Sequence, residues 1–166
     1  MSTMPRSLNF QFLEGHDENL LEYAEVAERL VLSDPNTALL KMRQFVETLA
    51  EELLERVGVD IGHDPGLLPA LRALRREQAY DRRIADLFHE IRKTGNRAAH
   101  AHADDAGESI RTLKKCRILA IWYHRTFGRQ AGFKPQPFTL APQPAPSTLS
   151  PRVEEALAEQ DDWDWG

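Results

Sequence analysis

The sequence of 166 residues predicts an all-α fold, a compact bundle of about five helices followed by a proline-rich, acidic C-terminal tail. Apolar residues recur at spacings of three and four over several long segments, which is the period of an amphipathic helix. Capping residues stand before most of these segments. No segment shows the strict alternation of apolar and polar residues that is typical of a half-buried strand. We therefore expect helices that pack mostly as antiparallel neighbours.

The first two helices are predicted over residues 17–32 and 34–58. Asp17 is a good N-cap for the first helix, because its carboxylate can accept a hydrogen bond from a free backbone N–H. Asp34 caps the second helix, and Pro35 takes the first helical position, where a missing N–H costs nothing. A glycine ends this range, as is common after a helix. The broad apolar stripe of the second helix predicts a place at the centre of the core.

Three further helices are predicted over residues 67–78, 81–94 and 105–128. Gly95 and Asn96 follow the second of these, and we expect them to interrupt or end it. The last of the three is apolar over most of its girth. That pattern is typical of a helix that is buried centrally or faces a partner.

Composition divides the chain near its last fifth. Residues 132–166 hold six of the ten prolines and carry two basic and six acidic side chains, whereas residues 1–131 carry 19 basic and 20 acidic ones. We expect a helical bundle over the longer part and a proline-rich linker or tail after it, with a short helix near 151–160. The two phenylalanines of 133–138 are expected to lie back on the bundle. Residues 161–165 are interpreted as an acidic-aromatic docking peptide for a basic partner, and the alternative is that the chain stops inside a linker.

Composition also excludes several functional classes. No run approaches the ~20 apolar residues that a membrane-spanning helix needs, so no membrane contact is expected. The first residues lack the apolar stretch of a secretory signal. The single cysteine, Cys116, excludes a disulfide framework and fits a cytoplasmic location. It lies on an apolar stripe and is interpreted as a packed thiol. No glycine-rich phosphate loop is present, and no cofactor is expected.

Charge is segregated within the predicted bundle. Residues 14–60 carry four basic and twelve acidic side chains, residues 72–97 eight basic and four acidic, and residues 111–129 six basic and no acidic. The basic segments suit nucleic acid, the acidic half of a second copy, or an acidic partner. The alternative is an ordinary solvated surface. The candidate nucleic-acid contacts are Arg72, Arg75, Arg76, Arg82, Arg83, Lys93, Arg111, Lys114 and Lys115.

The segment from Phe88 to His102 is the most informative about chemistry. It places three histidines, three basic residues and an asparagine between two apolar helices. A histidine can move a proton, and an arginine can hold a phosphate charge. The candidate catalytic residues are Arg92, Asn96, Arg97, His100 and His102. Asp104 and Asp105 follow two of these histidines and complete a weak metal-ligand pattern, but we expect no metal.

Four segments spread over residues 8–138 carry a family resemblance. They are Asn9–Leu13, Asp34–Glu47, Leu87–His100 and the aromatic Trp122–Gly128. They resemble the HEPN family (higher eukaryotes and prokaryotes nucleotide-binding), a helical bundle. The most similar members are the HEPN-like N-terminal domains of type I restriction enzyme R subunits and related DEAD/DEAH-type helicases. The resemblance implies a defence complex with other subunits or a motor domain.

HEPN ribonucleases use an arginine, usually followed by a polar residue, and a histidine four to six residues beyond. Two such sites typically meet across a dimer. Arg97 and His102 meet this spacing, but Ala98 follows the arginine. The resemblance therefore leaves the catalytic pair open.

A second alignment puts His100 in the histidine position and Asn96 in the polar position. Gly95 then stands where the arginine belongs, and Arg92 is the nearby substitute. The structural alternative is that Asn96 caps the next turn and His100 bonds a backbone carbonyl between helices.

Three hypotheses of function follow. The first is a non-catalytic HEPN-like domain of a type I restriction-modification or other phage-defence system, which contacts DNA, RNA or other subunits and is no enzyme in isolation. The second is a metal-independent endoribonuclease that acts as a homodimer. The third is a purely structural dimerisation module that uses the apolar helix at 105–128.

Overall fold

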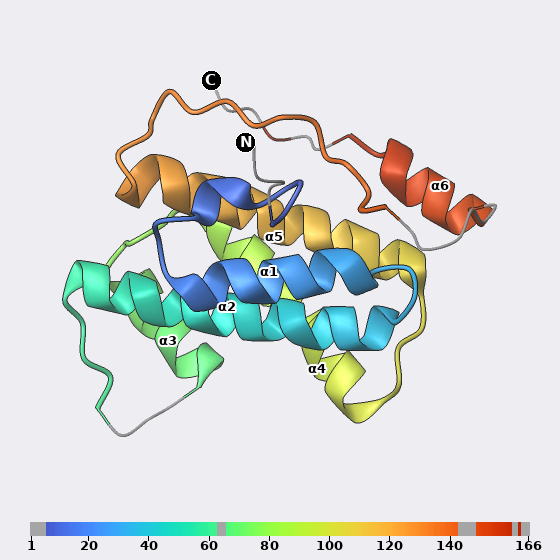
Figure 1. Cartoon of the computed structure of the whole chain (residues 1–166). Helices are drawn as coiled ribbons and strands as arrows, with labels where there is room; N and C mark the ends of the chain where they lie inside the picture. The colour runs from blue at the N-terminus through green and yellow to red at the C-terminus, as the bar shows by residue number, and fades with distance from the viewer. Residues whose placement is uncertain (1–5, 63–65, 143–148, 161–162, 164–166) are drawn as a thin grey trace.

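The computed structural model describes residues 6–62, 66–142, 149–160 and 163. These residues contain six α-helices and one short 3₁₀ helix, and no strand, which confirms the all-α prediction (Figure 1). In chain order the elements are η1 (Gln11–Leu13), α1 (Glu18–Leu30), α2 (Pro35–Val57), α3 (Leu67–Arg76), α4 (Arg82–His100), α5 (Ala106–Phe127) and α6 (Pro151–Ala158). No helix among the described residues is long and apolar enough to cross a membrane.

Helix α2 is central, as predicted, because it contacts α1, α3, α4 and α5. Asp34 caps its start by accepting a hydrogen bond from the backbone N–H of Thr37 at 3.2 Å. Gly58 ends it in the left-handed conformation with φ of 73°, which other residues rarely adopt. The helix sends a stripe of buried side chains into the core: Leu39, Met42, Phe45, Val46, Leu49 and Leu53.

Helix α4 runs without interruption to His100, so the prediction that Gly95 and Asn96 interrupt or end it is wrong. Gly95 is buried where α4 crosses α2. A Cβ atom added at Gly95 would lie 2.7 Å from the Cβ atom of Arg43 on α2, closer than real Cβ atoms approach other atoms. The glycine therefore allows two helix backbones to approach each other and makes no turn.

Asn9 joins the N-terminal segment to three other parts of the chain. Its side-chain amide nitrogen donates to Glu28 Oε1 at 2.6 Å and to the carbonyl of Thr139 at 2.7 Å. Its side-chain oxygen accepts from the backbone N–H of Thr139 at 2.8 Å, and its carbonyl accepts from Arg117 Nε at 3.4 Å. Burial raises the pKa of Glu28, while hydrogen bonds from Ser7 and Asn9 oppose that rise.

The chain after α5 returns along the bundle. Phe133 packs against Phe12 and His124, with ring centroids 5.0 and 4.8 Å apart. The ring of Phe138 lies 5.6 Å from the ammonium of Lys114. Both phenylalanines therefore lie on the bundle, as predicted. The guanidinium of Arg117 also donates a hydrogen bond to the carbonyl of Gln136, and this bond holds the segment against α5.

Helix α6 packs on α5 and buries Val153 and Ala156 in the same core. Ser150 caps it by accepting from Val153 N at 3.3 Å. With α2 and α4 also in contact, most of α5 is buried by its own chain. Of the predicted docking peptide at 161–165, only Trp163 lies within the described residues.

Candidate functional site

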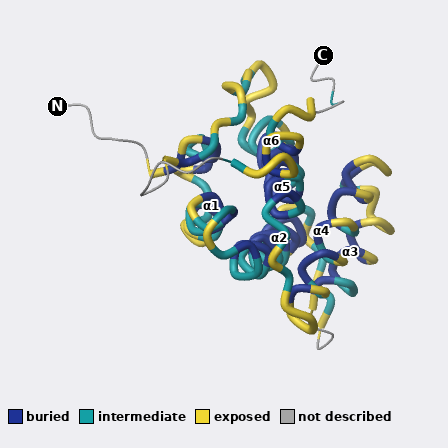
Figure 2. Tube along the Cα trace, turned by 90° about the vertical axis from the view of Figure 1, so that its right-hand side faces the viewer, coloured by how far each residue is buried: buried dark blue, intermediate teal, exposed yellow. Residues whose placement is uncertain are grey.

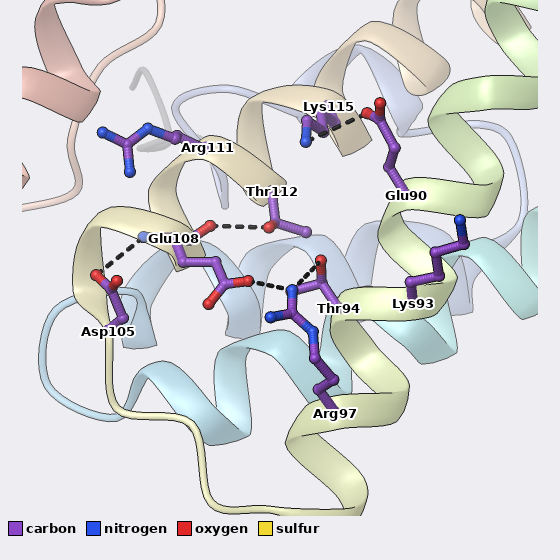
Figure 3. Close-up of a pocket in the computed structure, with 9 residues that line it drawn as sticks. All are labelled: Glu90, Lys93, Thr94, Arg97, Asp105, Glu108, Arg111, Thr112 and Lys115. Carbon is purple, nitrogen blue, oxygen red and sulfur yellow. Dashed lines mark hydrogen bonds and ion pairs between the residues drawn. The ribbon is translucent and has the colours of Figure 1, made fainter.

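A groove of about 500 Å³ opens between the second half of α4 and the first half of α5, beside the candidate catalytic segment (Figure 3). Cations and carboxylates alternate along it. It is lined by Glu90, Lys93, Thr94, Arg97, Asp105, Glu108, Arg111, Thr112 and Lys115.

Most cations of this groove already face a carboxylate. Arg97 points across from α4, with Nη2 2.5 Å from Glu108 Oε1 and 3.3 Å from Thr94 Oγ1. Lys115 lies 3.2 Å from Glu90. Because the Arg97 side chain is 67% exposed, its ion pair is screened by water and contributes little stability. The groove is therefore close to charge balance.

The two candidate histidines lie at the end of α4 and in the loop beyond it. His100 is the last residue of α4, and both it and His102 are exposed. The loop is held by the backbone N–H of Ala103, which donates to Asn36 Oδ1 at 2.8 Å. His102 lies near enough to Asp34 to help lower the pKa of that carboxyl, although hydrogen bonds from Thr37 are the larger cause.

The structure does not bring the five candidate catalytic residues together. Within the part of the chain that the structure describes, no hydrogen bond joins Arg97 to His100 or His102. Asn96 lies inside α4 and cannot cap a following turn, so the structural alternative is wrong for this residue. Arg92 and Arg97 are five positions apart along α4, so the two arginines point about 140° apart around the helix and do not line one groove. Arg92 instead lies near His89, on another face of α4.

The candidate nucleic-acid contacts fall into two groups. The first group lies on α3 and the start of α4 and is exposed: Arg72, Arg75, Arg76, Arg82 and Arg83. Arg83 places its guanidinium 4.0 Å from the centre of the Trp163 ring. Across the described ranges, no ion pair is recorded for the other four arginines.

The second group lies along the α4–α5 groove and is mostly engaged within the chain. Arg111 Nε lies 3.0 Å from both carboxylate oxygens of Glu159, just after α6. Lys114 is buried beneath α6 and donates to the carbonyls of Ala156 and Glu159 at 2.8 and 2.7 Å. These contacts complement the exposed carbonyls at the end of a helix. Lys93 has no carboxylate at ion-pair distance among the described side chains.

The acidic segment 14–60 and the basic segment 72–97 lie on different helices of the bundle. Viewed down its length, α1 lies at one side and α3 and α4 at the other, with α2 and α5 between them (Figure 2). The acidic segment 14–60 covers α1 and α2, whereas the basic segment 72–97 covers most of α3 and α4. The acidic segment therefore reaches from one side of the bundle to its middle, and the basic segment 72–97 lies on the other side.

A pair of histidines was missed by the sequence analysis. His16 Nε2 and His124 Nδ1 share a hydrogen bond of 2.9 Å, although 108 residues separate them. Burial lowers the pKa of both, and the nearby charge of Arg56 lowers that of His16 further, against the opposite effect of Glu52. Only a contact between distant segments reveals the pair. No local pattern marks either histidine.

No group of three or more histidine, cysteine, aspartate or glutamate side chains within the described residues is arranged to hold a metal ion. The loop residues His100, His102, Asp104 and Asp105 thus form no ligand cluster.

Comparisons with known proteins add two findings. The model of the family described as "Domain of unknown function (DUF4145)" matches residues 25–121. The chain is 33% identical over 143 residues to the type I restriction enzyme EcoKI endonuclease subunit of Escherichia coli (strain K12), a match that covers 84% of this chain and 12% of that protein. The chain thus spans only a small part of the length of this curated relative. No solved structure matches the chain.

Proposed function

Because the chain belongs to the DUF4145 family and is related to a segment of a type I restriction endonuclease subunit, we propose that it is a non-catalytic, HEPN-like domain of a restriction or other phage-defence system. It contacts nucleic acid through α3 and the start of α4. The word "subunit" in the relative's name supports other subunits of such a complex as partners.

The observation that carries this proposal is the group of exposed arginines on one side of the bundle. Arg72, Arg75, Arg76 and Arg82 have no carboxylate at ion-pair distance among the described residues. A guanidinium matches the oxygens of a phosphate with two parallel N–H donors, and several together hold a polyanion. Residues 72–97 carry eight basic and four acidic side chains, so this part of the bundle has an excess of positive charge although the chain has a net charge of −5.

The non-catalytic part of the proposal rests on the α4–α5 groove. Arg97 faces Glu108, which competes with a phosphate for the same guanidinium. Neither His100 nor His102 is positioned by a hydrogen bond to a second side chain among the described residues. A general base is usually oriented by such a partner.

Binding of labelled duplex DNA and single-stranded RNA to the full chain tests the proposal. The triple variant Arg72→Gln/Arg75→Gln/Arg76→Gln should weaken binding. It should also reduce the slope of log affinity against log salt by at least about one, since each phosphate contact contributes about 0.9 on duplex DNA. The charge-matched control is Arg29→Gln/Arg56→Gln/Lys134→Gln, whose three residues are exposed and lie outside α3 and α4. Binding that is insensitive to salt, or equally weak in both variants, would overturn the proposal.

The ribonuclease alternative has a separate test. Single-stranded RNA is incubated with the purified chain in EDTA, and cleavage is compared with the His100→Ala and His102→Ala variants. Under the proposal no cleavage above background occurs. Cleavage that either substitution abolishes would establish the alternative in its place.

A further inference from the structure

A second, smaller pocket lies between α3 and α4. It has a volume of about 340 Å³, and its walls are Leu71, Arg72, Arg75, Arg76 and His89. No carboxylate lines it, whereas three carboxylates line the α4–α5 groove. We call it the α3–α4 pocket. The pocket is therefore positively charged, because no carboxylate in its walls offsets the three arginines.

The three arginines reach this pocket because of their spacing along α3. Arg75 and Arg76 follow Arg72 by three and four positions, so each is a neighbour of Arg72 on the surface of the helix, with Cβ atoms about 5–6 Å apart. All three side chains line the same pocket instead of forming a row along the surface. Row-like spacing suits successive phosphates of a strand. Convergence suits one anion of high charge.

His89 adds a different kind of donor from the facing helix. Burial lowers its pKa, and the neighbouring charges of Arg92 and Lys93 lower it further, while Asp86 acts in the opposite direction. The imidazole is therefore neutral at pH 7 and offers one N–H donor. Within the part of the chain that the structure describes, no hydrogen bond is recorded for it.

We propose that the α3–α4 pocket binds a phosphomonoester, the group at the end of a nucleic-acid strand or on a free nucleotide. Such a group carries between one and a half and two negative charges at pH 7, against one for an internal phosphodiester, and has three terminal oxygens. Three guanidinium groups exceed that charge, and together with one neutral N–H they supply enough donors for three terminal oxygens. If the chain contacts nucleic acid as proposed, the phosphate is the one at the end of the bound strand. To that extent the inference rests on the proposed function.

The first arm of the test observes the pocket itself in the full chain. The imidazole NMR resonances of His89 are followed while inorganic phosphate, AMP or adenosine is added, with His16 and His124 as internal references. Phosphate and AMP should shift His89 in a saturable way, and adenosine should not. Arg75→Gln should weaken AMP binding at least tenfold, as expected when a charge-assisted hydrogen bond is lost, whereas Arg29→Gln should not. An unmoved His89, or equal binding by Arg75→Gln, would overturn the inference.

The second arm identifies the source of the phosphate. Oligonucleotides of one sequence, with and without a 5′-phosphate, are compared for affinity. Tighter binding of the phosphorylated strand, lost in Arg75→Gln, places the strand end in the pocket. Equal affinities together with an AMP shift identify a free nucleotide or phosphate as the ligand. Salt-sensitive oligonucleotide binding without any phosphate effect on His89 refutes the inference alone, and a phosphate effect without oligonucleotide binding refutes the proposed function alone.

Discussion

Gly95→Ala is the sharpest test of how the bundle is held together. At an ordinary helix position this substitution stabilises a protein by about 1 kcal/mol, because alanine has the higher helix propensity. At Gly95 the new Cβ would lie 2.7 Å from the Cβ of Arg43. That atom is fixed to the α2 backbone and cannot rotate away, so the helices must separate or tilt.

The expected net effect is destabilisation. Overpacking costs about 1–3 kcal/mol, and a contact between two backbone-attached atoms belongs at the upper end of that range. Subtracting the propensity gain leaves a net loss of about 2 kcal/mol in the free energy of unfolding. For a chain of this length the melting temperature should fall by about 4–8 °C. Urea and thermal denaturation followed by circular dichroism measure both quantities, with an unchanged m value showing that the folded state stays compact.

A double-mutant cycle with Arg43→Gly isolates the contact. Removing the side chain of Arg43 removes the clash, so in that background Gly95→Ala should become stabilising by about 1 kcal/mol, the ordinary propensity gain. Arg43→Ala keeps the Cβ atom and should restore little. If Gly95→Ala stabilises the unmodified chain, the close approach of α2 and α4 does not require the glycine, and the reasoning fails.

Two further predictions concern side-chain contacts made by α5. The pKa values of His16 and His124 are lowered in the folded state, so the unfolded chain takes up protons first as pH falls below about 6.5, and the free energy of unfolding should fall in that range. Urea denaturation at pH 7.5 and 5.5 measures this fall, which should be smaller for the variant His16→Gln/His124→Gln. A fall of the same size in the variant would contradict the prediction. Lys114→Met should release the end of α6 at a cost of about 1.5–3 kcal/mol, the range for a hydrogen bond to a charged group, and raise amide hydrogen exchange in residues 151–160. The control Lys115→Met removes only a partly exposed ion pair and should leave that exchange unchanged.

The parts of the fold that the sequence predicts well are those with local causes. Asp34, Pro35 and Gly58 act within one helical turn, so the bounds of α2 follow from them. The apolar stripe of α2 likewise predicts its central place. The error at Gly95 has the opposite origin, because a glycine that ends a helix and one that admits a neighbouring helix are indistinguishable along the chain. The cause there is Arg43, more than fifty residues away.

The candidate site shows the same limit for charged residues. Lys114 and Arg111 read as part of an exposed basic run, yet α6 covers one and Glu159 pairs with the other. Arg72 and Arg76 stay exposed without an ion pair among the described residues, although their sequence pattern is no different in kind. Which cations stay available depends on where a helix forty residues later packs. The spacing of apolar residues along the chain does not predict where that helix packs.

The hydrogen bonds of Asn9 have a mechanical consequence. They join the segment that enters the bundle to Thr139 in the segment that leaves it, through two opposed bonds of 2.7 and 2.8 Å. A force that pulls Ser7 away from Ala141 would therefore load this amide clamp and the neighbouring Arg117 contact to Gln136 before it reaches the helices. Tension along a longer polypeptide would then pass directly between the segments of Asn9 and Thr139 through these hydrogen bonds. The helices between them, including α3 with its exposed arginines, would bear less of it.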